Sequence, residues 1–183
     1  MKYSIEQLKE RFDKDELLKY IFFWGHTPSK DGSIQKSCFS QWWLSDFEIG
    51  GALYKTAEHW MMAEKARLFD NEVIRIEVLK TPHPNAVKKL GRKVKGFDSE
   101  KWNAHKYEIV KQGNYHKFIQ NRDLKDFLLD TGDRIIVEAS PLDPVWGIGL
   151  SQDDTEATNP HLWKGDNLLG FALMEVRDML REE

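Results

Sequence analysis

The sequence of 183 residues has one cysteine, Cys38, and no apolar run near the roughly 20 residues that a transmembrane helix requires. A single cysteine excludes a disulfide within the chain and is typical of a reducing compartment. The net charge is only −3, so the chain as a whole has no strong attraction for nucleic acid or anionic membranes. Its first residues, MKYSIEQLKERF, are too charged for a secretory signal. These absences favour a protein of the cytosol or nucleus.

The motifs of several enzyme classes are also missing. The six histidines form no HExxH pair and have no cysteine partner, so we expect no metal site and no cofactor. Ser40 and Ser45 lack the Gly-x-Ser-x-Gly elbow, and Cys38 lies in an apolar run. Nothing in the sequence therefore supports acyl-transfer chemistry.

Tryptophan is the residue type present in excess, with seven in the chain. Large aromatic side chains fill protein cores, and they also stack on nucleobases. We expect most of the seven to lie in the core. They are Trp24, Trp42, Trp43, Trp60, Trp102, Trp146 and Trp163.

Hydrophobic periodicity and turn residues predict an α+β fold, a single compact helix-rich domain with a small β-sheet. No repeat or interdomain linker is evident, so residues 20–183 are expected to form the domain, with 1–19 as an N-terminal helical extension. Strands are expected over 21–24 and 134–140, together with a strand that runs into a loop over 36–43. Helices are expected over 4–19, 54–69, 71–80, 84–91, 99–120, 123–129 and 168–180.

The helix expected from YKTAEHWMMAEKARLF places an acid and a base on its apolar face. Glu58 and Lys65 are seven residues apart, so they share one side of the helix, about 10 Å apart along its axis. One interpretation is structural: the lysine reaches solvent and the glutamate accepts from a backbone donor. The chemical alternative is a desolvated lysine that attacks a carbonyl-like carbon beside a carboxylate that acts as general acid or base. That chemistry suits the anomeric carbon of a sugar.

Three other positions have the composition of ligand-binding turns. In PVWGIGL, Trp146 lies between turn residues, and two glycines permit backbone amides to approach a ligand. In GDNLLGFALMEVRDML, Asp166 or Asn167 can cap a helix whose first turn contains Gly170, and an exposed helix N-terminus binds phosphate. Asp153 follows the PVWGIGL segment and can hold a ribose hydroxyl. A packed tryptophan, simple capping and a solvated loop explain the same residues equally well.

Seven segments follow one another in a distinctive order: FFWG, CFSQWW, YKTAEHWMMAEKA, LGRKVKGFD, KYEIVKQGNYHKFIQN, LLDTGDRIIVEASPLDPVWGIGL and GDNLLGFALMEVRDML. Together they resemble the NADAR family, also called YbiA-like, over about residues 20–181. The most specific part is T-x-E-H with a downstream lysine, then W-G-I-G, then N-x-L-G-x-x-L-M-x-V-R. The resemblance implies a compact α+β domain and cleavage of N-glycosidic bonds.

The resemblance also implies roles for individual residues. Glu58 and Lys65 would lie at the reacting sugar. The segment S-Q-W departs from the S-N-F that is more frequent in the family. The implied ligand-binding set is Trp24, Gly25, His26, Ser40, Gln41 and Trp42; Trp146, Gly147, Ile148, Gly149 and Asp153 on the ribose side; and Asn167 and Gly170 at the phosphates.

Two substrate classes follow from the resemblance. The leading expectation is an enzyme that removes ADP-ribose from guanine in nucleic acid, and the alternative is a glycosidase of ribosylated intermediates of riboflavin synthesis. A third hypothesis is a module that binds ADP-ribose without turnover. The presence of both Glu58 and Lys65 argues against it, because a binding module needs no nucleophile. We expect ADP-ribose or ADP-ribosylated nucleic acid as the partner, with no membrane and no obligate protein partner.

Two mechanisms are compatible with an acid and a base at the sugar. In the first, Glu58 orients or protonates while Lys65 attacks C1 of the ribose, and water hydrolyses the Schiff-base-like intermediate. In the second, water attacks directly with Glu58 as the base. The sequence does not distinguish between them.

Overall fold

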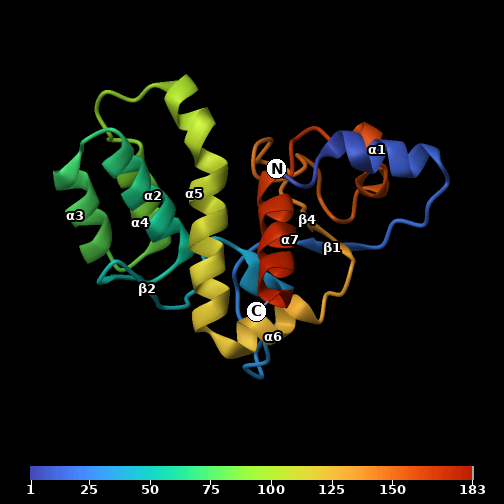
Figure 1. Cartoon of the computed structure of the whole chain (residues 1–183), viewed down its shortest axis with the longest axis horizontal. Helices are drawn as coiled ribbons and strands as arrows, with labels where there is room; N and C mark the ends of the chain where they lie inside the picture. Colours follow the sequence, from blue (N-terminus) through green and yellow to red (C-terminus); the bar gives the residue numbers. More distant parts are fainter. Residues whose placement is uncertain (183) are drawn as a thin grey trace. The chain divides into compact units, whose positions relative to one another are not determined.

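The structure is a computed structural model that describes residues 1–182. Its backbone groups into two compact units, one formed by Met1–Ser40 with the chain from Asp123 onward, the other by Gln41–Arg122. Figure 1 shows the elements of both. Within residues 1–182, no helix has the length and apolar character needed to cross a bilayer.

The first unit contains a pair of parallel strands covered by a helix. Strand β1 pairs in parallel with β4, and Ile21 lies opposite Ile136. Helix α7 packs on β4 (Figure 1), and ten of its fourteen residues are buried, so it has little solvent-facing surface. The elements of this unit are α1 (Ile5–Asp13), β1 (Tyr20–Phe23), η1 (Lys36–Phe39), α6 (Arg122–Leu129), β4 (Ile135–Glu138), η2 (Thr155–Thr158), η3 (Pro160–Leu162) and α7 (Leu168–Arg181).

The second unit surrounds one helix, α2, with three others. Helix α2 packs against α3, α4 and α5 (Figure 1), and nine of its twelve residues are buried. An antiparallel hairpin precedes it, with Phe47 opposite Tyr54. The elements are β2 (Phe47–Ile49), β3 (Ala52–Tyr54), α2 (Ala57–Leu68), α3 (Glu72–Lys80), α4 (Pro84–Gly91) and α5 (Ser99–Gln120).

The N-terminus of α2 is held by a buried threonine and histidine. The Thr56 hydroxyl oxygen accepts from the His59 backbone N–H at 3.3 Å and donates its own proton to His59 Nδ1 at 2.7 Å. The other ring nitrogen, Nε2, donates to the Thr81 carbonyl at 2.9 Å, where α3 ends. Burial lowers the pKa of His59, in agreement with a neutral ring that bridges the two helices.

Two neighbouring helices approach α2 closely at glycines. Gly91 of α4 lies against the Met62 side chain, and Gly113 of α5 lies against the Trp60 ring. A Cβ atom at either glycine would overlap these side chains. The Trp60 indole donates to the Ile109 carbonyl at 2.7 Å, which fixes the ring beside α5.

The expected α+β architecture, rich in helices with a small β component, is confirmed. The strand expected over 36–43 is wrong, because a single 3₁₀ turn there buries the consecutive side chains of Cys38 and Phe39. The first helix ends at Asp13 instead of residue 19, and Asp15 follows it with a left-handed φ of 54°. The hairpin before α2 was not predicted, and it takes Tyr54 out of the helix expected to start there.

We expect Gly170→Ala to lower the free energy of unfolding by about 1–3 kcal/mol, the usual cost of overpacking. A Cβ at Gly170 would overlap the Ile136 carbonyl oxygen, which is backbone of β4 and has little room to move. Gly91→Ala is the matched control, because it is the same change in a helix and meets only the flexible Met62 side chain. Urea unfolding of both variants measures the difference. Equal losses would show that the β4 contact is not the cause.

Candidate active site

Glu58 and Lys65 both lie on α2, in the unit Gln41–Arg122. Glu58 is 3% exposed, whereas Lys65 is half-buried. An acidic side chain is rarely buried to this extent without a structural or chemical reason. The face of α2 that the spacing predicted to carry an acid and a base is therefore a desolvated face.

The Lys65 amine is held against two aromatic rings. Its Nζ atom lies 4.3 Å from the centroid of the Phe97 ring and 5.5 Å from that of Trp102. Burial lowers the pKa of Lys65, the Glu58 carboxylate opposes that change, and the positive charge of Arg92 adds to it. At a given pH, more of the Lys65 amine is neutral than for a lysine in water, and a neutral amine is the nucleophilic form.

Two of the predicted ligand-binding residues belong to the same unit. Gln41 is buried, and its backbone carbonyl accepts from the Glu58 N–H at 2.9 Å, directly at the start of α2. Trp42 is half-buried, with the Lys88 amine 5.8 Å from the centroid of its ring. The structure thus brings Gln41 to the backbone of Glu58, which its distance in the sequence did not indicate.

The remaining predicted residues belong to the other unit, where the W-G-I-G turn lies along the end of β4. The Ile148 N–H donates to the Glu138 carbonyl at 2.9 Å, and the Ile148 carbonyl accepts from the Lys164 N–H at 2.8 Å. A Cβ at Gly147 would lie 2.7 Å from the Glu138 oxygen. Gly149 has a φ of 67°, which favours glycine. These backbone contacts give both glycines a structural role.

The N-terminus of α7 differs from the exposed anion site expected from the sequence. The N–H groups of Leu168 and Leu169 donate to carbonyls of residues 145 and 146, at 3.3 and 3.1 Å. The Asn167 side chain makes no capping bond; it accepts from the Glu138 N–H and donates to the Ile136 carbonyl, both at 3.0 Å. Phosphate binding by Asn167 and Gly170 stays a prediction, and it cannot use these two helix N–H groups unless the turn moves.

Four further predicted residues of this unit lie in exposed segments. Trp24, Gly25 and His26 follow β1 and are exposed, as is Asp153 just before η2. Ser40 is half-buried after the 3₁₀ turn Lys36–Phe39. Their ligand roles stay predictions.

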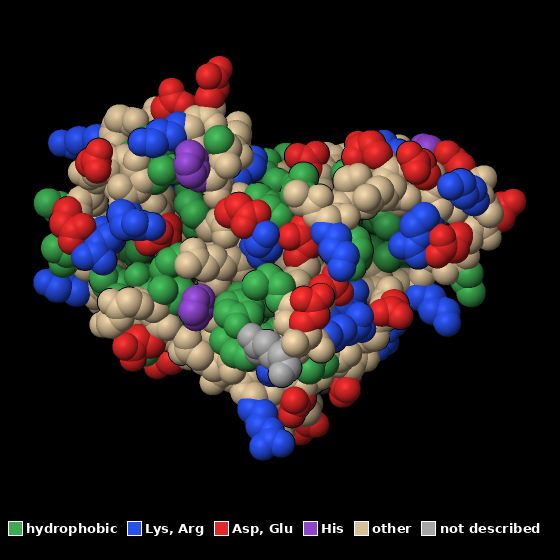
Figure 2. Space-filling model, viewed as in Figure 1, with side chains coloured by type: hydrophobic (Ala, Val, Ile, Leu, Met, Phe, Trp, Pro, Cys, Tyr) green, Lys and Arg blue, Asp and Glu red, His purple; other side chains and the backbone are tan. Residues whose placement is uncertain are grey.

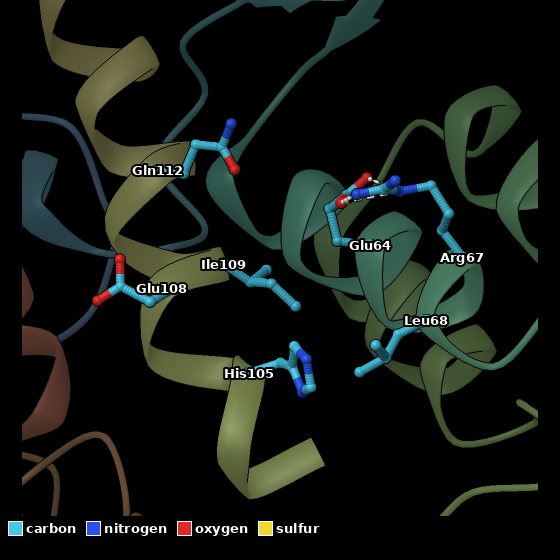
Figure 3. Close-up of a pocket in the computed structure, with 7 residues that line it drawn as sticks. All are labelled: Glu64, Arg67, Leu68, His105, Glu108, Ile109 and Gln112. Carbon is cyan, nitrogen blue, oxygen red and sulfur yellow. Dashed lines mark hydrogen bonds and ion pairs between the residues drawn. The ribbon is translucent and has the colours of Figure 1, made fainter. Parts of the chain in front are cut away.

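A cavity of about 360 Å³ lies between α2 and α5, and it includes neither Glu58 nor Lys65 (Figure 3). On the α2 side of the cavity, Glu64 is 6% exposed and forms an ion pair with Arg67. On the α5 side, His105 Nδ1 donates to the Lys101 carbonyl at 2.7 Å. Glu64 and Lys65 are adjacent in the sequence but point to different sides of α2, so this cavity is separate from the candidate catalytic pair.

Charges are mixed on the surface seen in Figure 2, where acidic and basic side chains alternate without an extended basic region. This agrees with the small net charge of the chain. Within residues 1–182, no group of three or more histidine, cysteine, aspartate or glutamate side chains is arranged to hold a metal ion.

Comparison with known proteins adds an independent line of evidence. The sequence model of the NADAR domain matches residues 22–181. The chain belongs to the NADAR family. The match leaves out α1 (Ile5–Asp13), which lies before its first residue.

Several NADAR relatives carry names that describe an activity. "N-glycosidase R617" of Acanthamoeba polyphaga mimivirus is 41% identical over 165 residues, which are 87% of this chain and 95% of the viral protein. "N-glycosidase YbiA" of Escherichia coli (strain K12) is 29% identical, covering 80% of this chain and 81% of that protein. The NMR structure of the E. coli protein YbiA matches with a TM-score of 0.71 and 26% identity, over 91% of this chain and 88% of that one.

Sequence reasoning missed three residues that the structure places around the candidate pair Glu58 and Lys65. Phe97 and Trp102 contact Lys65, and Asn114 of α5 is fully buried and bonded to Gln41. None of them is near Glu58 or Lys65 in the sequence. The tryptophan excess included Trp102, and two of the family segments included Phe97 and Asn114, but none of these signals singled out the residue.

We expect Lys65→Met to raise the midpoint of thermal unfolding at pH 7 by a few degrees. Because the pKa of Lys65 is lower in the folded chain than its ordinary 10.5, the unfolded state binds more protons between the two values, so native stability rises with pH there. Removing the amine removes this penalty, and the gain should shrink as the pH approaches 10.5.

Thermal unfolding at several pH values from 7 to 10.5 measures this gain. Lys106→Met is the control, since Lys106 is also half-buried and its amine donates only to Asn103. The same gain with the same pH dependence in the control would contradict the assignment to Lys65.

Proposed function

We propose that this NADAR protein is an N-glycosidase that removes ADP-ribose from guanine in nucleic acid. The observation that carries the proposal is the pairing, on one helix, of a buried carboxylate with a lysine whose pKa is lowered by burial. N-glycosidase names among the relatives support the reaction class. The identity of the base and of the group beyond the ribose is our expectation from the family resemblance.

In the proposed reaction, the neutral Lys65 amine attacks C1 of the ribose as the bond from C1 to the base nitrogen breaks. The electron pair of that bond leaves with the base, which takes a proton from the Glu58 carboxyl group. The nitrogen now bonded to C1 gives a proton to the Glu58 carboxylate, which passes it to the ring oxygen as the bond from C1 to that oxygen breaks and a Schiff base forms on Lys65. Water adds to C1, and release of the amine regenerates the lysine and gives the ribosyl product.

The surroundings of the pair fit these roles. Lys65 must lose a proton before it attacks, and the desolvation of its half-buried side chain lowers its pKa and so favours the neutral amine. Glu58 is almost without solvent contact, which suits a carboxyl group that exchanges a proton with a bound substrate. Because each group influences the charge of the other, the two should titrate as a coupled pair.

We expect Glu58→Gln to lower turnover of an ADP-ribosylated guanine oligonucleotide by about 10²–10⁴-fold, the usual contribution of a general acid or base. Binding of ADP-ribose, followed by calorimetry, should persist because the side chain keeps its shape. Glu64→Gln is the matched control, a second buried glutamate of α2 that is paired with Arg67 instead. Turnover at the wild-type rate in Glu58→Gln would remove Glu58 from the mechanism.

Borohydride added during turnover is expected to trap a sugar adduct on Lys65, detected as added mass on the peptide that contains it. Lys65→Arg should abolish both trapping and activity, because a guanidinium group does not lose its proton near neutral pH. Lys106→Arg, at another half-buried lysine, should retain both. An active Lys65→Arg enzyme without an adduct would favour direct attack by water with Glu58 as base.

The same assay tests the alternative substrate. A ribosylated pyrimidine intermediate of riboflavin synthesis is offered in parallel with the ADP-ribosylated oligonucleotide. Cleavage of the pyrimidine compound alone would overturn the proposed substrate and retain the N-glycosidase. ADP-ribose binding without cleavage of either compound would favour a binding module.

A further inference from the structure

A buried pair of amide side chains lies next to the backbone of Glu58. Gln41 is 8% exposed, and Asn114, in the middle of α5, is not exposed at all. Asn114 Nδ2 donates to Gln41 Oε1 at 2.8 Å, and the Gln41 backbone carbonyl accepts from the Glu58 N–H at 2.9 Å. A continuous chain of bonds therefore runs from α5 through Gln41 to the first turn of α2, all within the unit Gln41–Arg122.

The orientation of both amides is determined by one backbone carbonyl. Asn114 Nδ2 also donates to the Val110 carbonyl at 2.9 Å, and a carbonyl only accepts. Turning the Asn114 amide over would place two oxygens against each other, so its nitrogen must face Val110. The same nitrogen meets Gln41, which must then present Oε1 to it. Gln41 Nε2 is directed away from Asn114 as a consequence.

The outer atoms of the two amides have no bonded protein partner. Gln41 Nε2, a donor, and Asn114 Oδ1, an acceptor, are both shielded from solvent and make no hydrogen bond to any residue among 1–182. Each such group destabilises the folded chain when it is buried without a hydrogen bond. Native proteins contain few of them, and those that persist are frequently part of a functional site. The oxygen of a hydroxyl group can accept a hydrogen bond from Gln41 Nε2.

We propose that Asn114 is a positioning residue of the catalytic site, which holds the Gln41 amide so that Nε2 donates to a hydroxyl oxygen of the substrate's ribosyl group. Because Gln41 is 8% exposed and Asn114 is not exposed at all, we place Gln41 next to the ligand and Asn114 behind Gln41. The hydroxyl is then held beside the first turn of α2, which contains Glu58. The identity of this hydroxyl rests on the proposed function; the orienting role of Asn114 does not.

Asn114→Asp is the first test, because it keeps the shape and removes the donor. An aspartate cannot donate to Gln41 Oε1, so the Gln41 amide should turn over and direct an oxygen at the ligand. We expect kcat/KM to fall by about tenfold or more, as for a lost hydrogen bond. Asn103→Asp is the matched control on α5, an exposed asparagine that accepts only from Lys106. Wild-type kcat/KM in Asn114→Asp would overturn the proposal.

A second variant separates positioning from folding. Gln41→Met with Asn114→Leu replaces the amide pair by apolar side chains of similar size, so native stability should be equal to or above that of the wild type. Activity should still fall at least as far as in Asn114→Asp. On a substrate whose ribose lacks the bound hydroxyl, the 2′-deoxy or the 3′-deoxy form, wild type and double variant should become equal. Equal loss on every substrate, or unchanged activity, would overturn the proposal.

A third measurement does not depend on the reaction: ¹⁵N NMR of the Gln41 side-chain amide, recorded without any substrate. Its signals should shift in Asn114→Asp and stay in place in Asn103→Asp. Unchanged signals in Asn114→Asp would refute the orienting role whatever the substrate is. If the wild type cleaves no ribosyl compound, the proposed function fails, and this measurement still decides the role of Asn114.

Discussion

Burial of α2 is the constraint on which the second unit depends. The helix contains a glutamate at its start, a histidine, an indole N–H and a second glutamate, and all four residues are nearly inaccessible to solvent. Each buried polar group destabilises the fold unless it is bonded. The partners of three of the four are Thr56, the N-cap of α2, and the end of α3 for His59; the Ile109 carbonyl of α5 for Trp60; and Arg67, on α2 itself, for Glu64. Two of these bonds connect α2 to other helices, one to the end of α3 and one to α5.

This arrangement explains why the pKa of Lys65 is lowered. A lysine on a solvent-facing helix surface keeps its proton near neutral pH, and one buried entirely would destabilise the fold. Lys65 is half-buried, with its stem among α2 neighbours and its amine against two rings, one of them the partly exposed Phe97. The pKa of Lys65 is lowered while a route to solvent and substrate remains.

Much of the helical structure was predictable because its signals are local. Thr56 before α2 and Pro84 at the start of α4 mark helix ends in any context. The hairpin Phe47–Tyr54 and the 3₁₀ turn at Cys38 were missed or misread, because their short apolar segments fit several structures until a partner is known. Helical spacing alone predicted that Glu58 and Lys65 share one side of α2, whereas their role at the sugar came from the family resemblance. Phe97, Trp102 and Asn114 did not, since they reach α2 only through the packing of α5 and the loop before it.

Because α2 is buried on nearly every side, it lacks the single apolar face that lets most helices form early and dock later. Its hydrogen bonds break only if α3, α4 and α5 separate from it together. Local opening should therefore be rare, and its backbone amides should exchange with deuterated water only through unfolding of the whole unit. The residues proposed to act on the sugar then lie on the most slowly exchanging helix of Gln41–Arg122, which keeps the distance between carboxyl and amine constant over many turnovers.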